Sequence, residues 1–246
     1  AFVIYFAAWI SGVREKIATF KLGTIPFIVI LILVSAVLLS QRDTDTLMVT
    51  AAAGLAMFIS GGGRWRDLLF LCIIGMIGLG GIIAVRPYVL TRIKTFLDPS
   101  RDPLGSGYQI QQSLIAIGSG EVFGRGYGQS IQKFKFLPES IGDSIYAVAG
   151  EEFGFVGASG IILLFLLFVF RGLKIARRIP DMFGGLVVVG IIIIVVSQAF
   201  VNIGAMLAVL PLSGIPLPFF SHGGTALFFT LVEMGLILNI SKFQRV

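Results

Sequence analysis

The chain alternates between long apolar runs and shorter polar connections. The apolar runs cover residues 1–12, 25–40, 46–60, 67–85, 145–170, 183–210 and 224–240. A helix needs about 20 apolar residues to cross the hydrocarbon core of a bilayer, and flanking side chains or local thinning allow somewhat fewer. The pattern therefore predicts about seven transmembrane helices in a single all-α domain, residues 1–246.

The first apolar run begins at residue 1, which is an alanine. A whole helix usually starts with capping residues, and a whole membrane protein with a methionine or a signal peptide. We therefore expect this run to be the end of a cut helix, with further helices upstream in the full protein.

The composition supports a polytopic membrane protein. Hydrophobic residues make up 56% of the chain and charged residues only 13%, whereas soluble proteins carry about 25% charged residues. With one cysteine and one histidine, neither a disulfide framework nor the usual kind of zinc site can form. The net charge of +6 indicates topology and attraction to anionic membrane lipids, so no nucleic-acid partner is expected.

Basic residues concentrate in alternate connections between the runs. They are Arg14, Lys16, Lys21, Arg64, Arg66, Arg171, Lys174, Arg177, Arg178, Lys242 and Arg245. Because Lys and Arg are enriched in the cytoplasmic loops of membrane proteins, these connections are predicted to face the cytoplasm. The long connection 86–144 and the connection 211–223 then lie outside the cell.

The connection 86–144 is much longer than loops usually are without a function. Within it, Ile110, Leu114 and Ile117 recur at helical spacing, which predicts an interfacial or re-entrant helix over 107–118. The loop also holds a glycine-rich stretch and seven cations, of which five are candidates for anion binding: Arg86, Arg92, Arg125, Lys133 and Lys135. The stretch is either a flexible connector or an anion cradle, in which glycine N–H groups line a nest and Arg125, Lys133 and Lys135 supply the positive charge. Together with Arg86 and Arg92, these outward cations suggest a phosphorylated, lipid-linked substrate.

Four acidic residues stand in "FKFLPESIGDSIYAVAGEEFGF", where this loop leads into the next apolar run. The letters "SIGD" match a capping box, with Ser140 as the N-cap and Asp143 at the third helical position. At the mouth of a helix beside a polar loop, Asp143 is also a candidate general base or a candidate ligand for a divalent cation. Glu139 stands near it at the predicted water boundary.

Glu151 and Glu152 follow roughly two helical turns deeper, where an ionised group is costly and is a candidate functional residue. The structural alternative is an ion pair with a loop arginine such as Arg86 or Arg92. We expect the structural role for both acids.

Glu233 raises the same question midway along the last apolar run. Asn202 and Gln198 stand four residues apart on the preceding run, a spacing that places them on one helix face. We expect a structural hydrogen bond between Glu233 and these amides rather than catalysis.

The stretch "PLSGIPLPFFSHGG" holds three prolines in eight residues. Proline removes a main-chain donor and interrupts helices, so we predict a stiff, non-helical segment that forms a lid or lines a cavity. His222 within it is expected to be a hydrogen-bonded loop residue rather than a catalyst.

Long stretches between residue 86 and the C-terminus resemble the SEDS family, which comprises FtsW, RodA and SpoVE. They are "RIKTFLDPSRDPLGSGYQIQQSLIAIGSGEVFGRGYGQSIQKFKFLPE", "EEFGFVGA" and "PLSGIPLPFFSHGGTAL". Of these, "GYQIQQS" and "QSIQKFKFLPE" are most like the FtsW branch. The resemblance implies a fold of ten membrane helices, of which this chain would hold the fourth to the tenth.

The same resemblance implies a peptidoglycan glycosyltransferase of cell division, acting at the outer face of the bacterial cytoplasmic membrane. It would join the disaccharide of lipid II to a glycan strand and release undecaprenyl pyrophosphate. The implied partners are a class B penicillin-binding transpeptidase and other divisome membrane proteins. No covalently bound cofactor is expected, and Mg²⁺ or Mn²⁺ is a candidate cation.

Residue by residue, the essential aspartate of the family maps onto Asp143, and the arginine of its "RPY" stretch maps onto Arg86. The flanks of Asp143 depart from the family pattern, since "IGDSIYA" stands where "HTDFIFA" is usual. We hypothesise an inverting transfer with Asp143 as the base or the cation ligand. The five loop cations would offset charge on the leaving pyrophosphate, and the other four acids would support the structure.

Three other functions stay open. A flippase for lipid-linked precursors would place polar groups along the whole membrane depth, whereas most polar groups here gather at the predicted outer face. A RodA-type polymerase of cell elongation would use the same chemistry. A scaffold that only recruits the transpeptidase would need no reactive carboxylate.

Overall fold

The computed structural model describes residues 1–244, except the side chains of Glu15, Ala84, Val85 and Lys135. The predictions for Arg245 and for the Lys135 side chain therefore lie outside the described residues. In the described part of the chain every regular element is helical, which confirms the all-α prediction. The chain forms two compact units: residues 1–80, 168–197 and the part from 231 onward make the first, and residues 81–167 and 198–230 the second.

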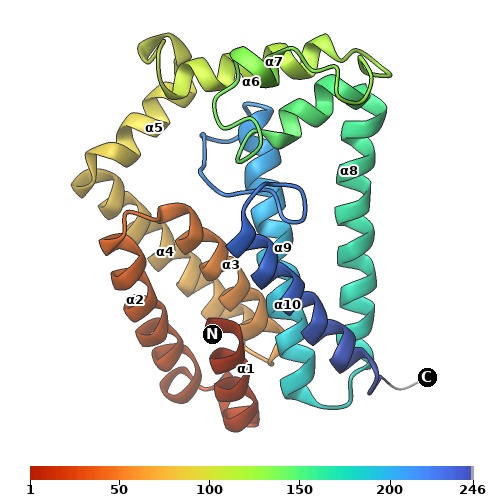
Figure 1. Ribbon diagram of the computed structural model, residues 1–246. Coiled ribbons are helices and arrows are strands. Elements are labelled where there is room, and N and C mark those ends of the chain that lie inside the picture. The colour runs from red at the N-terminus through yellow and green to blue at the C-terminus, as the bar shows by residue number, and fades with distance from the viewer. Residues whose placement is uncertain (245–246) are drawn as a thin grey trace. The chain divides into compact units, whose positions relative to one another are not determined.

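All seven apolar runs form helices (Figure 1). They are α1 (Phe2–Val13), α2 (Ile25–Ser40), α3 (Thr44–Ser60), α4 (Trp65–Val85), α8 (Ile145–Arg178), α9 (Met182–Met206) and α10 (Gly224–Ser241). Among the described residues, five helices are long and apolar enough to cross a membrane, and α1 and α3 are shorter apolar helices. A π-helical turn extends α2 backward, so that the helix Phe20–Ser40 has 21 residues. The apolar pattern predicts a shorter helix because Lys21 and Gly23 interrupt it.

An aromatic core joins α1, α2 and α3 within the first unit. The ring of Phe27 on α2 lies 5.2 Å from the ring of Phe6 on α1 and 5.2 Å from the ring of Phe58 on α3. All three side chains are buried. Aromatic pairs at this separation contribute about 0.5–1.5 kcal/mol each beyond the burial of their area, so these rings stabilise the packing of three rather short helices.

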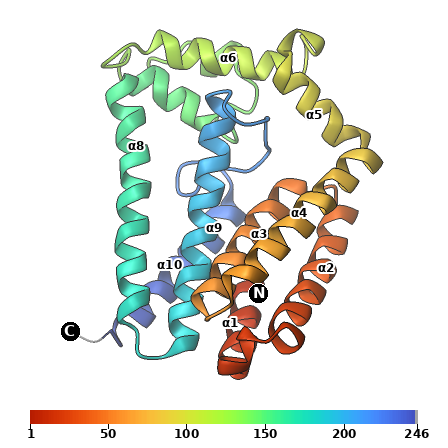
Figure 2. The ribbon, with the colours of Figure 1, turned by 180° about the vertical axis from the view of Figure 1, so that it is seen from behind.

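The second unit contains the long connection and its three helices: α5 (Pro87–Leu97), α6 (Ser106–Ser119) and α7 (Gln132–Lys135). α6 confirms the helix predicted over 107–118, and Figures 1 and 2 show it running across the end at which α8 begins. Its buried face carries Ile110, Ser113 and Ala116, whereas Leu114 is 44% exposed. The predicted apolar stripe is thus partly wrong, because Ser113 can be buried once its hydroxyl donates to the Gln109 carbonyl, at 2.8 Å.

α8 is broken near its start. Gly154 has a φ of 65° and a ψ of −164°, backbone angles that are essentially restricted to glycine. Helical hydrogen bonding therefore stops at this residue and resumes beyond it. The sequence predicts an unbroken run over 145–170, because glycine within an apolar stretch is equally typical of close helix packing.

The proline-rich segment 211–223 is non-helical, as predicted. Ile215 and Leu217 are buried. The rings of Phe219 and Phe220 lie 6.5 and 6.4 Å from the ring of Phe165 on α8. The segment is therefore fixed in place by apolar contacts within the second unit.

Candidate functional site

Asp143 lies in the turn that precedes α8. The helix itself begins at Ile145. Gly142 N and Ser144 N both donate to the Glu139 carbonyl, at 3.0 and 3.1 Å, and these hydrogen bonds close the turn. Glu139 therefore contributes through its main chain, while its side chain is exposed.

The predicted capping box is wrong. Ser140 Oγ donates to the Lys133 carbonyl, at 3.2 Å, instead of capping a helix. Ser144 Oγ donates to the Pro138 carbonyl and accepts from Gln109 Nε2 of α6, both at 2.9 Å. The turn that carries Asp143 is therefore held by the preceding segment and by α6.

The backbone at Asp143 is also held by residues that come much later in the sequence, which donate hydrogen bonds to three consecutive carbonyl groups. The hydrogen bonds run from His222 N to the Ile141 carbonyl at 2.8 Å, from Ser221 Oγ to the Gly142 carbonyl at 2.7 Å, and from Asn202 Nδ2 to the Asp143 carbonyl at 2.7 Å. His222 is thus a hydrogen-bonded loop residue, as predicted. Ser221 is a member of the site that the sequence did not single out.

Asn202 has a role that the sequence did not predict. Its side chain is fully buried, and Nδ2 donates to the Ile215 carbonyl, at 2.8 Å, as well as to Asp143. Asn202 thus donates to both loops of the site. The predicted hydrogen bond with Glu233, which belongs to the first unit, stays a prediction. A segment rich in proline has few main-chain N–H donors, so its carbonyls need donors from other segments. This need is the sequence signal that could have predicted a hydrogen bond from Asn202 to the segment. Glu233 itself is half-buried on α10.

The Asp143 side chain is half-buried beside the proline-rich segment. A Cβ atom added to Gly214 would lie 3.6 Å from Asp143 Oδ2, so the carboxylate lies close to the main chain of this glycine. A partly solvated carboxylate on a fixed backbone can accept a proton from a hydroxyl group or bind a divalent cation. The geometry is therefore suited to either chemistry.

The predicted loop cations fall into two groups. Arg86 and Arg92 lie at the start and in the middle of α5, with the Arg92 guanidinium 6.0 Å from the centre of the Tyr88 ring. Arg125 and Lys133 lie in the later part of the connection and contact acidic residues of α8. Arg125 and Lys133 thus take part in supporting α8, whereas Arg86 and Arg92 belong to the earlier part of the connection.

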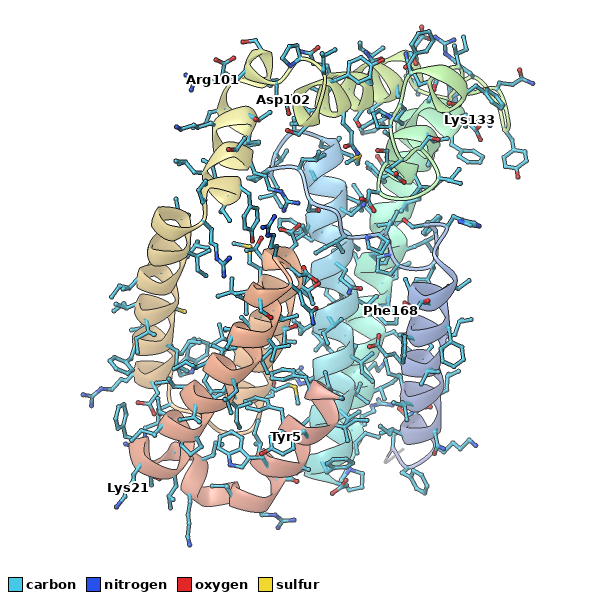
Figure 3. All side chains as sticks on the ribbon, turned by 60° about the vertical axis from the view of Figure 1, so that its left-hand side comes forward. Tyr5, Lys21, Arg101, Asp102, Lys133 and Phe168 are labelled. Atoms are coloured by element: carbon cyan, nitrogen blue, oxygen red, sulfur yellow. The ribbon has the colours of Figure 1, made fainter. Side chains whose placement is uncertain are left out.

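Glu151 and Glu152 make the predicted kind of ion pair, but not with the arginines of α5. Arg125 Nε lies 3.6 Å from Glu151 Oε1, and Lys133 Nζ lies 2.5 Å from Glu152 Oε1. Figure 3 labels Lys133 beside the first turns of α8. The partners differ because the connection folds back so that its middle, and not its start, covers these acids.

Two further acids of the connection stabilise local turns. Asp98 accepts hydrogen bonds from Ser100 and from Arg101 Nε, the latter at 3.1 Å, and these contacts lower the pKa of its carboxyl from the usual value. Asp102 Oδ2 accepts from Ser106 N, at 2.8 Å, where α6 begins. Arg101 and Asp102 are labelled in Figure 3. These acids therefore have structural roles.

Comparison with known proteins identifies the family. A family model described as a cell cycle protein of the FtsW/RodA/SpoVE type matches residues 1–246. Stage V sporulation protein E of Bacillus subtilis is 40% identical over 245 residues, which are 100% of this chain and 67% of that protein. A probable peptidoglycan glycosyltransferase FtsW of Geobacter sp. (strain M18) is 36% identical and is covered to the same extent.

Solved structures agree with this assignment. A chain from a peptidoglycan synthase complex that coordinates polymerization and crosslinking matches with a TM-score of 0.76 and 26% identity, over 98% of this chain and 67% of that one. The rod shape determining protein RodA of Thermus thermophilus matches with a TM-score of 0.65 and 23% identity, over 99% of this chain and 64% of that one. The chain spans about two thirds of the length of these proteins. Since the family model covers all its residues, the chain belongs to the FtsW/RodA/SpoVE family of multi-pass bacterial inner-membrane proteins.

Proposed function

We propose that this protein is a peptidoglycan glycosyltransferase and that Asp143 is its general base. The observation that carries the assignment of Asp143 is its fixed backbone: three consecutive carbonyls, ending at Asp143, accept hydrogen bonds from α9 and from the proline-rich segment. A base must stand within hydrogen-bond reach of the proton it removes. A backbone tied from both sides keeps the carboxylate at one position.

The proposed donor is lipid II, and the proposed acceptor is a sugar hydroxyl of a growing glycan strand. As the hydroxyl oxygen attacks the anomeric carbon of lipid II, the Asp143 carboxylate takes the hydroxyl proton. The bond from the anomeric carbon to the pyrophosphate oxygen breaks with its electron pair, which releases undecaprenyl pyrophosphate and inverts the anomeric carbon. Arg86, which precedes α5, and Arg92 within it would offset the charge on the leaving group, because fixed cations stabilise charge that develops in the transition state.

A divalent cation such as Mg²⁺ or Mn²⁺ fits this arrangement as an addition. Among the side chains that the structure describes, no group of three or more His, Cys, Asp or Glu residues is placed to hold a metal ion. Mg²⁺ often binds through one or two carboxylates together with substrate phosphates and water. Asp143 would then share the cation with the pyrophosphate, and polymerisation would fall when EDTA is added.

The proposed partner is a class B penicillin-binding transpeptidase, with other membrane proteins of the division machinery around it. The support is the likeness to a chain from a peptidoglycan synthase complex, at 26% identity, together with relatives that carry the FtsW name. The distribution of basic residues supports an outward orientation of the site.

The test replaces Asp143 by Asn in the full-length protein, reconstituted with its transpeptidase and supplied with lipid II. Loss of a general base lowers the rate by roughly 10²- to 10⁴-fold, so glycan polymer on a gel should fall by that factor. The matched control is Asp98→Asn, an exposed aspartate of the same connection, which should polymerise normally. Full activity of Asp143→Asn would remove Asp143 from the mechanism, and transport of labelled lipid II across vesicles without polymer would favour a flippase.

A further inference from the structure

The break in α8 deprives four main-chain groups of their helical partners. In an unbroken helix the Glu151 carbonyl would accept from Phe155 N, and the Glu152 carbonyl from Val156 N. The angles of Gly154 separate these pairs. Unpaired main-chain groups are costly, above all within a membrane, so the break has to be completed from elsewhere.

Residues 121–126, here called the docking loop, complete it. Arg125 N donates to the Glu151 carbonyl and Gly126 N to the Glu152 carbonyl, both at 3.0 Å. In return, the Glu121 and Val122 carbonyls of the docking loop accept from α8. Phe155 N donates to the first at 2.9 Å, and Val156 N to the second at 3.1 Å. The docking loop therefore supplies a main-chain hydrogen-bond partner to each of the four groups of α8, as one strand of a β-sheet does for its neighbour.

Glycine permits this close approach. Gly124 has a φ of 79°, and a Cβ atom there would collide with the Glu152 carbonyl and with Gly154 N. A Cβ atom at Gly154 would collide with Gly124 N and with the main chain of Val122. The two glycines face each other across the break, and neither has room for a side chain.

The Glu151 carboxylate binds the next part of the same connection. Its side chain is fully buried. Oε2 accepts from Ser130 Oγ at 2.5 Å and from Gln132 N at 3.2 Å, and Oε1 accepts from Ile131 N at 3.1 Å. Arg125 Nε lies 3.6 Å away and balances the charge. One carboxylate therefore organises the whole turn at 130–132.

That turn leads directly to Asp143. Residues 132–135 form α7, whose Lys133 carbonyl accepts from Ser140 Oγ at 3.2 Å. The chain then enters the turn at 139–144. Residues 130–144, here called the site segment, are thus anchored at one end by Glu151 and carry Asp143 at the other.

We propose that Glu151 is a positioning residue for the transfer reaction: from α8 it holds the site segment and thereby places the Asp143 carboxylate. The proposal rests on the proposed function, and it assigns to Glu151 no contact with substrate. A carboxylate suits the role because all its partners are donors. A glutamine has one acceptor oxygen and would turn its own N–H₂ donors toward other donors, leaving buried groups unpaired.

The test measures the position of the site segment separately from the chemistry, in the full-length protein with its transpeptidase. Hydrogen–deuterium exchange followed by mass spectrometry reports on the amides of residues 130–144. In Glu151→Gln these amides should exchange faster, because the single acceptor oxygen of glutamine cannot serve both Ile131 N and Gln132 N. The kcat for lipid II should fall by about 10²-fold, the cost of displacing a reacting group by about 1 Å, while KM stays within about twofold because ground-state binding is untouched.

The matched control is Glu121→Gln in the docking loop, where the side chain is exposed and only the main-chain carbonyl is used. It should leave both exchange and kcat unchanged. Ser130→Ala removes one hydrogen bond to Glu151 and also the acceptor of Lys133 N, so its effect is judged at the amides of Ile131 and Gln132, and both readouts should move in the same direction by a smaller factor. It keeps the test decisive if Glu151→Gln fails to fold.

Unchanged exchange in Glu151→Gln and Ser130→Ala would overturn the positioning role, whatever the rates. Faster exchange with an unchanged kcat would overturn its link to catalysis. A third outcome concerns the unaltered protein. If the amides of its site segment exchange slowly but it makes no polymer, the proposed function is overturned and the anchoring by Glu151 is not.

Discussion

Glycine has opposite meanings in two apolar helices of this protein. At the break in α8, Gly154 has a positive φ and no room for a Cβ atom, because the docking loop lies against it. On α4, a Cβ atom at Gly75, Gly78, Gly80 or Gly81 would meet nothing within 4 Å. The same residue type, in two apolar helices, is thus required by backbone geometry in one place and has open space around it, among the described residues, in the other. Backbone angle and neighbours decide the role of a glycine, and composition does not.

The largest effect is expected for Gly154→Ala. Backbone strain of about 1–3 kcal/mol adds to the collision with the docking loop, so the free energy of unfolding in detergent should fall by about 3 kcal/mol or more. Gly160→Ala on the same helix is the control, since a Cβ atom there meets nothing within 4 Å. Equal stability of the two variants would contradict the description of the break.

Gly124→Ala tests the other side of the same contact. The docking loop can retreat, at the loss of its hydrogen bonds to α8, so a decrease of about 2 kcal/mol in the free energy of unfolding is expected. Gly128→Ala, which also has a positive φ of 79° but open space around it, separates backbone strain from collision. If both variants lose the same stability, strain alone is responsible.

The ion pair between Lys133 and Glu152 offers a sharper distinction between support and substrate binding. Lys133→Met should lower the free energy of unfolding by about 1–2 kcal/mol, because it leaves a nearly buried carboxylate unpaired, and partial exposure of the lysine reduces the effect. In the double variant Lys133→Met with Glu152→Gln the unpaired charge is removed. Its free energy of unfolding and its polymerisation rate should therefore return most of the way to those of the unaltered protein. A double variant that stays inactive with a raised KM for lipid II would assign Lys133 to the pyrophosphate instead.

The smallest effect is expected on α4. Because alanine favours a helix over glycine by about 1 kcal/mol, Gly78→Ala should leave the free energy of unfolding unchanged or raise it by up to about 1 kcal/mol, as measured in detergent. Transpeptidase binding, measured by co-purification, should not change. A loss of stability or of binding would show that this glycine face packs against another helix, and the contrast with α8 would then fail.

The helices could be predicted because hydrophobic runs are a local property of the chain. The seven apolar runs and the loop helix α6 all form, with bounds close to the expected ones. Asp143 was singled out by its motif and by its place before an apolar run. Local patterns could not predict the hydrogen-bond or ion-pair partner of a polar side chain, because that partner depends on how segments far apart in the sequence fold together.

Three glycines of α8 illustrate this limit. Gly150, Gly154 and Gly157 look alike in the sequence, but only Gly154 has a positive φ. The difference arises from a loop about 30 residues earlier. Likewise, Arg125 and Lys133 could be recognised as cations, but the acids they contact follow from the docking of that loop. The capping box failed for the same reason, since Ser140 found a partner in α7.

The order of synthesis gives the break in α8 a further consequence. Residues 121–126 leave the ribosome before Gly154 does, so the docking loop is already made when the helix that needs it enters the bilayer. A linker of equal length but unrelated sequence would leave the carbonyls of Glu151 and Glu152 unpaired in α8. The docking loop and the start of α8 therefore have to come from the same protein. Chimeras between relatives should exchange residues 120–157 as a single block, and a chimera with its junction between Gly126 and Gly154 should assemble poorly.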